Sequence, residues 1–249
     1  MISMFNADQC QSKLALLVGL GMITSAVTPF VLPPPVLAQS TFYDVQGHWA
    51  NSCITQLARQ GIINGYPDGS FRPSLYMNRA EFAAILGKAF PNAARTRKSV
   101  EFVDVPSYDW AYTAIKEASQ TGFLSGYPGK GFKPSKYIPR SQVLVALVSG
   151  LNYSPTMSAT ATLKANFADA NAIPVYARKG IAAATEKRLV VNYPNVKFLN
   201  PNKKATRAEV AAFLCQALSS SNQASGVPAQ YIAGTASSRT AQDFFQNKQ

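Results

Sequence analysis

Three segments of the chain repeat the spacing of one apolar helix face. In each segment apolar residues stand at positions i, i+3 and i+4, which lie on the same side of an α-helix. The three sets are Phe82, Ile85 and Leu86; Val143, Ala146 and Leu147; and Val210, Phe213 and Leu214. The pattern therefore predicts three amphipathic helices, which begin near Arg79, Arg140 and Arg207.

Another helix is predicted before each of these three. The apolar residues of the first copy recur with helical periodicity, at Trp49, Cys53, Ile54, Leu57 and Ala58. Gly61 and Gly122 suit the left-handed position just after such a helix. Arg188 stands at this position in the third copy, so we expect that helix to end differently.

The two helices and the loop between them form a unit that occurs three times. The same number of residues separates Trp49 from Gly65, Trp110 from Gly126, and Tyr176 from Asn192. Each unit opens on a related motif, FYDV, FVDV or FADA. We place the units at residues 42–90, 102–151 and 167–218, and we expect the segments between them to be linkers.

One such unit is too short to bury a hydrophobic core of its own. We therefore expect an all-α fold in which three helix-loop-helix repeats pack around a shared centre. Gly65, Gly126 and Asn192 begin the loop of each repeat, and all three are residue types that tolerate left-handed backbone. Gly65 and Gly126 would also allow a bulky ligand to approach the backbone.

Charge and the N-terminal pattern narrow the class of partner. The chain has 24 basic and 12 acidic residues, a formal net charge of +12 that favours anionic partners. Lys13, an apolar run at 14–27 and small or apolar residues at Val36 and Ala38 predict a signal peptide over residues 1–38. That run is shorter than the ~20 residues of a membrane span. We expect an exported protein of the cell envelope, with no transmembrane span after cleavage and no nucleic acid as partner.

Two cysteines and a long tail remain. Cys53 and Cys215 could form a disulfide in an oxidising compartment, or each could be a small buried residue. The second alternative is favoured because Ala114 and Gly180 occupy the place of Cys53 in the other repeats. Residues 219–249 are rich in Ser and Ala, which predicts a disordered tail, and the motif QDFFQ within it is a candidate docking element for a protein cargo.

An arginine begins the second helix of every repeat, although a cation at this end opposes the helix dipole by about 0.3–1 kcal/mol. One explanation is a solvated charge or a salt bridge to Asp44, Asp104 or Asp169. The other is an anion site, where the guanidinium and the free helix N–H groups bind one carboxylate or phosphate.

The other residues around these arginines also allow two interpretations. The pairs Asn78 with Glu81 and Thr206 with Glu209 fit capping boxes, which is a sufficient structural role, whereas Pro139 offers no cap. The tryptophans could be core residues or could stack on a sugar. The aspartates could cap the first helices or accept hydrogen bonds from ligand hydroxyls.

The motifs FYDV, HWA, GYPDGSF and RAEF resemble the S-layer homology (SLH) domain family, with three tandem units over about residues 42–218. The segments HWANSCITQL and RAEFAAILGKAF look most like the cyanobacterial branch. The resemblance implies a three-pronged, pseudo-threefold helical spindle. It also implies non-covalent binding of cell-wall glycans in grooves between neighbouring repeats, such as a pyruvylated secondary wall polymer or another acidic glycan linked to peptidoglycan.

The family's ligand positions carry over where the motifs match. They are Asp44, Trp49, Gly65, Arg79, Asp104, Trp110, Gly126, Arg140, Asp169 and Arg207. Tyr176 replaces the family's Trp, Asn192 its Gly, and Gln142 its Glu. We therefore expect the third repeat to contribute least, as a closing unit.

We expect a wall-binding anchor and no catalytic activity. His48 is the only histidine and stands at a predicted helix start. The sequence has no zinc-type cluster, Gly-rich phosphate loop or nucleophile motif, so no metal or cofactor is expected. The alternative function is an envelope scaffold that binds proteins or anionic lipid through its basic surface and tail.

Overall fold

The computed structural model describes residues 42–219 and 226–234. The helices are α1 (Asn51–Arg59), α2 (Arg79–Ala89), α3 (Tyr112–Gln120), α4 (Arg140–Gly150), α5 (Ala159–Asn166), α6 (Arg178–Glu186) and α7 (Arg207–Leu218). The all-α fold class is thereby confirmed for the described residues. No helix among them has the length and apolarity that crossing a bilayer would need. The predicted signal peptide and the QDFFQ motif lie outside the described residues.

The second helix of each repeat begins at its arginine, as predicted. Asn78 and Glu81 form a reciprocal capping box at the start of α2, and Thr206 and Glu209 do the same at α7. Pro139 occupies the equivalent position before α4 and makes no side-chain cap. The capping boxes are thus confirmed in the first and third repeats only.

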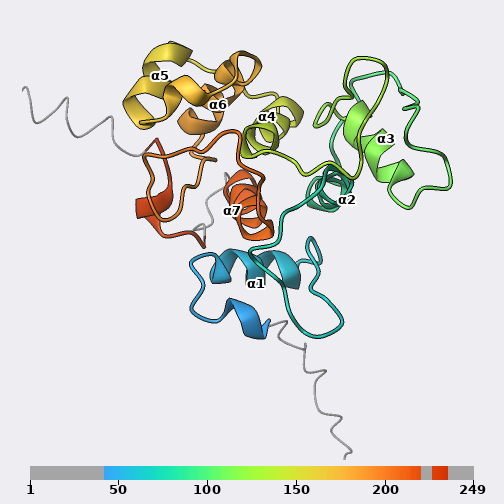
Figure 1. The fold of residues 1–249 in the computed structure, drawn as a ribbon, viewed down its shortest axis with the longest axis horizontal. Coiled ribbons are helices and arrows are strands. Elements are labelled where there is room, and N and C mark those ends of the chain that lie inside the picture. The colour runs from blue at the N-terminus through green and yellow to red at the C-terminus, as the bar shows by residue number, and fades with distance from the viewer. Residues whose placement is uncertain (1–41, 220–225, 235–249) are drawn as a thin grey trace, which may run out of the picture. The chain divides into compact units, whose positions relative to one another are not determined.

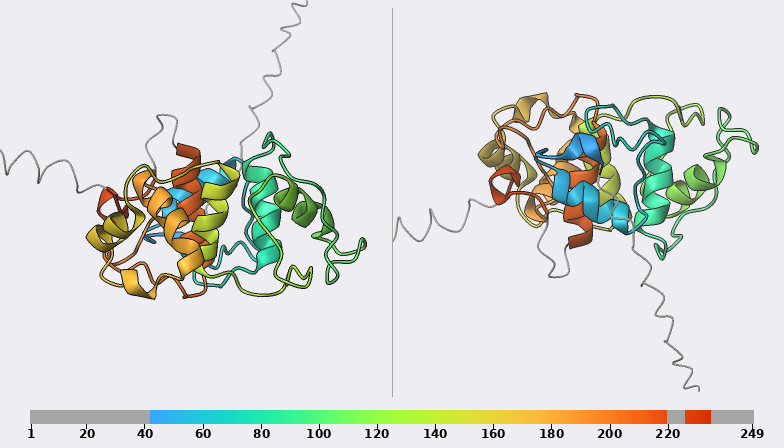
Figure 2. Two further views of the ribbon diagram at one scale, coloured as in Figure 1. Left: turned by 90° about the horizontal axis from the view of Figure 1, so that it is seen from above. Right: turned by 90° about the horizontal axis from the view of Figure 1, so that it is seen from below.

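Each repeat completes its packing with a helix from another repeat. Helix α3 packs against α2, α6 against α4, and α1 against α7. The first helix of each repeat therefore contacts the second helix of the preceding repeat, and the first repeat contacts the third. Figure 1 and Figure 2 show α3 beside α2 and α6 beside α4.

Three buried residues before the second helices link the repeats through a closed cycle of backbone hydrogen bonds. Met77 donates to Ala205 at 3.0 Å, Ala205 to Ile138 at 2.8 Å, and Ile138 to Met77 at 3.0 Å. Because these are equivalent residues, each repeat donates one bond and accepts one. The spindle shape implied by the family resemblance stays a prediction.

A disulfide joins Cys53 in α1 to Cys215 in α7, with the two Cα atoms 5.8 Å apart. Both residues are buried. The favoured alternative of two separate small core residues is therefore not the arrangement in the structure. The bond joins the first and third repeats covalently. It links α1 to α7, which pack together although 162 residues of sequence separate the two cysteines.

The segment between the second and third units is more than a linker, contrary to our expectation. Residues 159–166 form α5, where the Ser158 hydroxyl accepts a hydrogen bond from the Ala161 N–H at 3.4 Å. Leu163 is buried, and α5 packs against α6. A helix forms because the segment supplies both an N-cap and an apolar contact.

The prediction of a disordered tail is wrong for residues 226–234. Val227, Ile232 and Ala233 are buried, and the Ala233 N–H donates to the Val190 carbonyl at 2.9 Å. These few apolar side chains are enough to hold the segment against the third repeat. Residues 220–225 and 235–249 lie outside the described residues.

The third repeat ends its first helix in the same way as the other two. Arg188 has a φ of 58°, close to 70° at Gly61 and 83° at Gly122. The Arg188 N–H donates to the Thr185 carbonyl at 2.9 Å. The expectation of a different ending was wrong because the helix geometry is kept despite a residue that rarely adopts positive φ.

Candidate functional site

The three opening aspartates hold the loops between the helices. Each carboxylate accepts hydrogen bonds from two consecutive backbone N–H groups. These groups belong to Phe71 and Arg72 for Asp44, Phe132 and Lys133 for Asp104, and Leu199 and Asn200 for Asp169, at 2.7–3.0 Å. The second residue of each pair has a φ between 50° and 60°. The aspartates therefore stabilise a strained loop conformation in all three repeats.

The aspartates do not cap the first helices, so that alternative is wrong. Helix α1 begins after Ala50, which makes no side-chain cap, and the Ala50 N–H donates to His48 Nδ1 at 3.2 Å. His48 is thus a helix-start residue, as expected, and Asp109 accepts from Ala111 in the same way. Burial lowers the pKa of His48, which the carboxylate of Asp44 opposes.

Burial acts to raise the pKa of the Asp104 carboxyl, but the N–H groups of Phe132 and Lys133 outweigh it. The pKa of Asp104 is therefore lowered from its ordinary value. A carboxylate held ionised in this way keeps acceptor capacity for further donors at the loop surface.

Gly65 and Gly126 are required for space and not for positive φ, since neither has a left-handed backbone. A Cβ at Gly65 would overlap the Phe42 ring and lie 2.7 Å from the Ser70 carbonyl oxygen. At Gly126 it would lie 2.5 Å from the Phe102 ring. The predicted conformational role was wrong because an aromatic ring packs directly on each glycine Cα.

The three arginines bind the backbone of the next repeat in the cycle. Each Nε and one terminal nitrogen donate to two carbonyl groups at 2.7–3.0 Å. The acceptors are Phe132 and Ser125 for Arg79, Leu199 and Val191 for Arg140, and Phe71 and Asn64 for Arg207. Burial lowers the pKa of each of these arginines. Since arginine stays protonated even so, the structure holds a cation at each boundary between repeats.

The salt-bridge explanation named the wrong partners for these arginines. Among the described residues the only one of the three in an ion pair is Arg140, which meets Glu209 at 2.8 Å. Arg140 is 2% exposed and also donates to Asn192 Oδ1 at 2.6 Å. These contacts satisfy the guanidinium internally, and its contact with a glycan stays a prediction.

The boundary between repeats at Arg79 contains an open groove. At Arg140, the side chains of Asn192 and Glu209 occupy the corresponding place. The groove at Arg79 has a volume of about 230 Å³, and its lining includes Arg79, Ser125, Gly126, Tyr127, Gln142 and Tyr176. We call it the Arg79 groove. It brings together residues of all three repeats, so only the assembled protein forms it. Of the carried-over positions it contains Arg79 and Gly126.

The boundary at Arg140 is covered from within the protein. Trp49 stacks on Tyr193 with ring centroids 5.2 Å apart and an angle of 9° between the ring planes. The neighbouring Asn192 side chain is buried, and it accepts a hydrogen bond from Arg140 while its amide donates to the Val196 carbonyl at 2.8 Å. Trp49 is therefore partly buried by a neighbouring aromatic residue. Trp110 is 70% exposed, and its stacking on a sugar stays a prediction.

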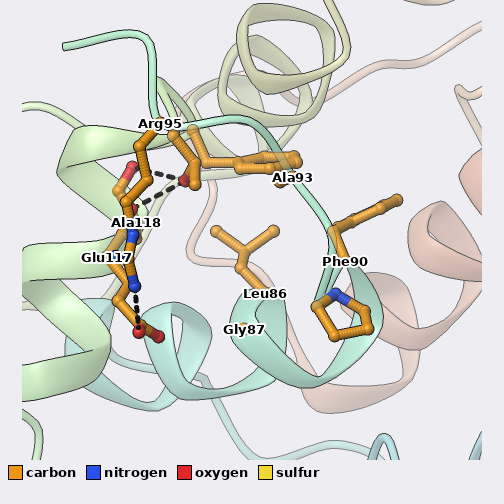
Figure 3. Close-up of a pocket in the computed structure, with 10 residues that line it drawn as sticks. Leu86, Gly87, Phe90, Ala93, Arg95, Glu117 and Ala118 are labelled. Atoms are coloured by element: carbon orange, nitrogen blue, oxygen red, sulfur yellow. Dashed lines mark hydrogen bonds and ion pairs between the residues drawn. The ribbon is translucent and has the colours of Figure 1, made fainter.

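The boundary at Arg207 has a smaller hollow of about 20 Å³, lined by residues that include Asn64, Phe71 and Arg207. Arg207 is only half-buried there. A further hollow of about 50 Å³ lies between α2 and α3. Figure 3 shows Leu86 and Phe90 in it, with the ion pair of Arg95 and Glu117 at its edge. In both, the space is smaller than in the Arg79 groove.

Sequence reasoning missed Tyr127, which lines the Arg79 groove, and Arg97, which contacts two serines of its lining. Tyr127 lies in the repeated GYP motif, and the Arg79 guanidinium carbon lies 4.9 Å from the centre of its ring. Arg97 comes from the predicted linker and donates to the hydroxyls of Ser125 and Ser149 at 3.0 and 3.2 Å. The internal repeat could have indicated Tyr127, but Arg97 has no counterpart in the repeats.

Comparison with known proteins agrees with this geometry. The S-layer homology domain family matches residues 41–83, 101–144 and 166–211. The chain is 31% identical to an amylopullulanase of Thermoanaerobacterium thermosulfurigenes over 194 residues, which cover 78% of this chain and 10% of that protein. It is 27% identical to an S-layer protein of Bacillus licheniformis over 78% of this chain and 22% of that protein.

A shorter match relates the chain to the cellulosome-anchoring protein of Acetivibrio thermocellus, with 40% identity over 30% of this chain and 17% of that protein. The chain thus spans between a tenth and about a fifth of the length of these relatives. The three family matches, in contrast, coincide with the three repeats and the loops that their aspartates hold. The chain belongs to the S-layer homology domain family, whose domain is a binding module.

Proposed function

We propose that this protein anchors itself non-covalently to the cell wall by binding an acidic polysaccharide, linked to peptidoglycan, in the grooves between its repeats. The Arg79 groove carries this proposal, because it is open to solvent and a buried cation lines it. The protein would be located in the cell envelope after export. It would act as a binding module and not as an enzyme.

Two relatives support a role at the cell surface through their names, an S-layer protein and a cellulosome-anchoring protein. Sugar recognition commonly combines an aromatic surface with a few placed polar groups. Tyr176 is 60% exposed and lines the Arg79 groove, so it offers such a surface beside the guanidinium. The likeness to the cyanobacterial branch stays a prediction, to which the relatives named above add no support.

The ligand residues carried over from the family resemblance take different parts in this proposal. Arg79 and Gly126 line the main groove, and Arg207 lies at a second, smaller one. The aspartates fix the loops and offer acceptors at their surface. Asn192 and Glu209 satisfy the Arg140 guanidinium from within the protein. The expectation that the third repeat contributes least stays a prediction, since Tyr176 of that repeat lines the main groove.

A pull-down with purified wall sacculi tests this function. We expect the protein to sediment with intact sacculi and to remain in solution once acidic polymers have been extracted from them. An Arg79→Ala variant should bind at least tenfold more weakly while keeping its helical circular dichroism. Equal sedimentation with intact and extracted sacculi would contradict the acidic-glycan proposal.

A further inference from the structure

A segment of the chain beyond α7 pairs with the backbone of the third repeat. We call residues 226–234 the C-terminal segment and residues 190–192 the third loop edge. The Asn192 N–H donates to the Tyr231 carbonyl at 2.9 Å, and the two stretches of backbone run antiparallel. This is the way in which an extended peptide adds to the exposed backbone edge of a protein.

Both ends of the C-terminal segment are closely packed against helices. Gly226 lies at the start of α1, where an added Cβ would be 2.8 Å from the Cβ of Ser52. At the other end, the Gly234 N–H donates to Asn166 Oδ1 at 3.2 Å. A Cβ at Gly234 would overlap the Thr185 carbonyl oxygen of α6. The segment therefore reaches from a helix of the first repeat to a helix of the third.

The second repeat has an equivalent loop edge that is open. The repeat spacing makes residues 124–126 equivalent to residues 190–192, and they line the Arg79 groove. Ser125 and Gly126 are exposed, whereas all three residues of the third loop edge are buried. Among the described residues, the Leu124 carbonyl and the Gly126 N–H form no hydrogen bond. Their counterparts in the third repeat are the two groups that bind the C-terminal segment.

Aromatic residues beside the two edges also correspond. Tyr127 and Tyr176 line the Arg79 groove, and the equivalent Tyr193 and Trp49 stack on each other at the boundary of Arg140. Tyr231 of the C-terminal segment meets Tyr193 edge-on, with the ring centroids 5.0 Å apart. The segment therefore contacts the equivalents of groups that are open to a ligand in the Arg79 groove.

We propose that the third loop edge is a binding site for an extended peptide, and that the protein's own C-terminal segment occupies it and thereby excludes wall ligands from this edge. The exclusion rests on the proposed wall-binding function, whereas the peptide site does not. One set of backbone groups cannot serve two occupants at once, so the segment and a wall ligand compete here. The segment competes at a high effective concentration because it belongs to the same chain.

Ile232→Asp in the full-length protein tests the site, because it places a charge on a buried side chain of the segment. Gln230→Asp is the matched control, since it adds the same charge at an exposed position of the segment. Hydrogen exchange at the Asn192 and Ala233 N–H groups should become at least tenfold faster in Ile232→Asp and change less than twofold in the control. The Ala205 N–H should stay protected in both, which shows that the repeats remain assembled. Unchanged exchange at Asn192 in Ile232→Asp would contradict the site.

A synthetic peptide with the sequence of residues 226–234 shows whether this edge recognises a peptide. At millimolar concentration it should shift the NMR signals of Asn192 and Tyr193 in the Ile232→Asp protein and slow the exchange at Asn192 again. The same peptide carrying Ile232→Asp should do neither. In wild-type protein the site is occupied, so the peptide should leave these signals in place. A peptide that shifts neither signal of the Ile232→Asp protein would overturn the assignment.

Sacculus binding separates the exclusion from the proposed function. Ile232→Asp should bind intact sacculi at least twofold more tightly than Gln230→Asp, and acidic fragments released from sacculi should shift the indole N–H signal of Trp49 only in Ile232→Asp. Equal binding by the two variants without a shift at Trp49 would overturn the exclusion and leave wall binding standing. If neither wild-type protein nor the variants bind sacculi, wall binding is wrong, and hydrogen exchange at Asn192 still decides the peptide site.

Discussion

At the residue scale, one arginine recurs three times in three different environments. In each case its Nε–H donates to a backbone carbonyl at the equivalent position of the next repeat. The residue therefore first serves to join neighbouring repeats. What differs is the residue at the position of Gln142, Glu209 or Glu81. Glu209 forms an ion pair with Arg140, whereas Arg79 lines an open groove beside the neutral Gln142. A glutamate at this position is not enough by itself, because Arg207 forms no ion pair with Glu81 among the described residues.

Arg140 gives a prediction about stability. Arg140→Ala leaves the largely buried Glu209 carboxylate without its partner. The loss of one partner from a buried ion pair costs about 3–5 kcal/mol of unfolding free energy. Urea unfolding followed by circular dichroism measures this. Arg95→Ala is the control, because its ion pair with Glu117 is exposed and contributes about 0–1 kcal/mol. Equal effects of the two substitutions would contradict the structural role of Arg140.

Asp104 gives a prediction about pH. Its pKa is lowered in the folded protein, so its carboxylate stabilises the fold above the ordinary value of 3.8, and this contribution is lost as the pH falls through the lowered pKa. The wild-type protein should therefore be more stable than Asp104→Asn at neutral pH, and the difference should shrink in acid. Urea midpoints from pH 7 to pH 2 test this, and a constant difference would contradict it.

The sequence indicated which single residues matter better than it indicated why. The motif glycines were marked by their repetition, but their reason lies in Phe42 and Phe102, which pack on Gly65 and Gly126. Such a contact joins distant parts of the chain and leaves no local signal. Arg97 was missed for the same reason, since its role depends on where the linker crosses Ser125.

At the scale of helices, apolar periodicity predicted the second helix of each repeat, and capping boxes indicated the starts of α2 and α7 but not of α4. These features are local, so they can be read from a short stretch of sequence. Helix α5 was missed because its segment contains few large apolar residues, and its contact with α6 decides its structure. The packing of each first helix against the second helix of another repeat also depends on tertiary contacts.

The disulfide between α1 and α7 gives a prediction at this scale. Replacing Cys53 and Cys215 by Ser should lower the unfolding free energy by about 2–5 kcal/mol, because the bond closes a loop of 162 residues. The helix content at room temperature should stay the same. Thermal unfolding measures the loss, and thiol titration of the wild-type protein is the check. Free Cys53 and Cys215 thiols in protein purified after export would contradict the bond.

At the scale of the whole molecule, three repeats that each lack a complete core form one binding protein. The repeats depend on one another through the cycle of backbone hydrogen bonds at Met77, Ile138 and Ala205. They also depend on one another because the first helix of each repeat packs against the second helix of another. The same arrangement places residues of three repeats around one groove. Under the proposed function, several weak contacts on one body would give avidity for a polymer.

The net charge of +12 gives a prediction for the whole protein. Binding to intact sacculi should weaken steadily as sodium chloride rises from about 0.05 to 0.5 M, because salt screens attraction between a basic protein and an acidic polymer. Sedimentation at each salt concentration measures this. Binding that does not change with salt would indicate a neutral ligand.

The most direct test of the central claim is a crystal structure of the protein with an acidic glycan fragment released from wall sacculi. We expect the acidic group of the fragment to lie against the guanidinium of Arg79, with a sugar ring beside Tyr176. A fragment bound elsewhere, with the Arg79 groove left unchanged, would contradict the account.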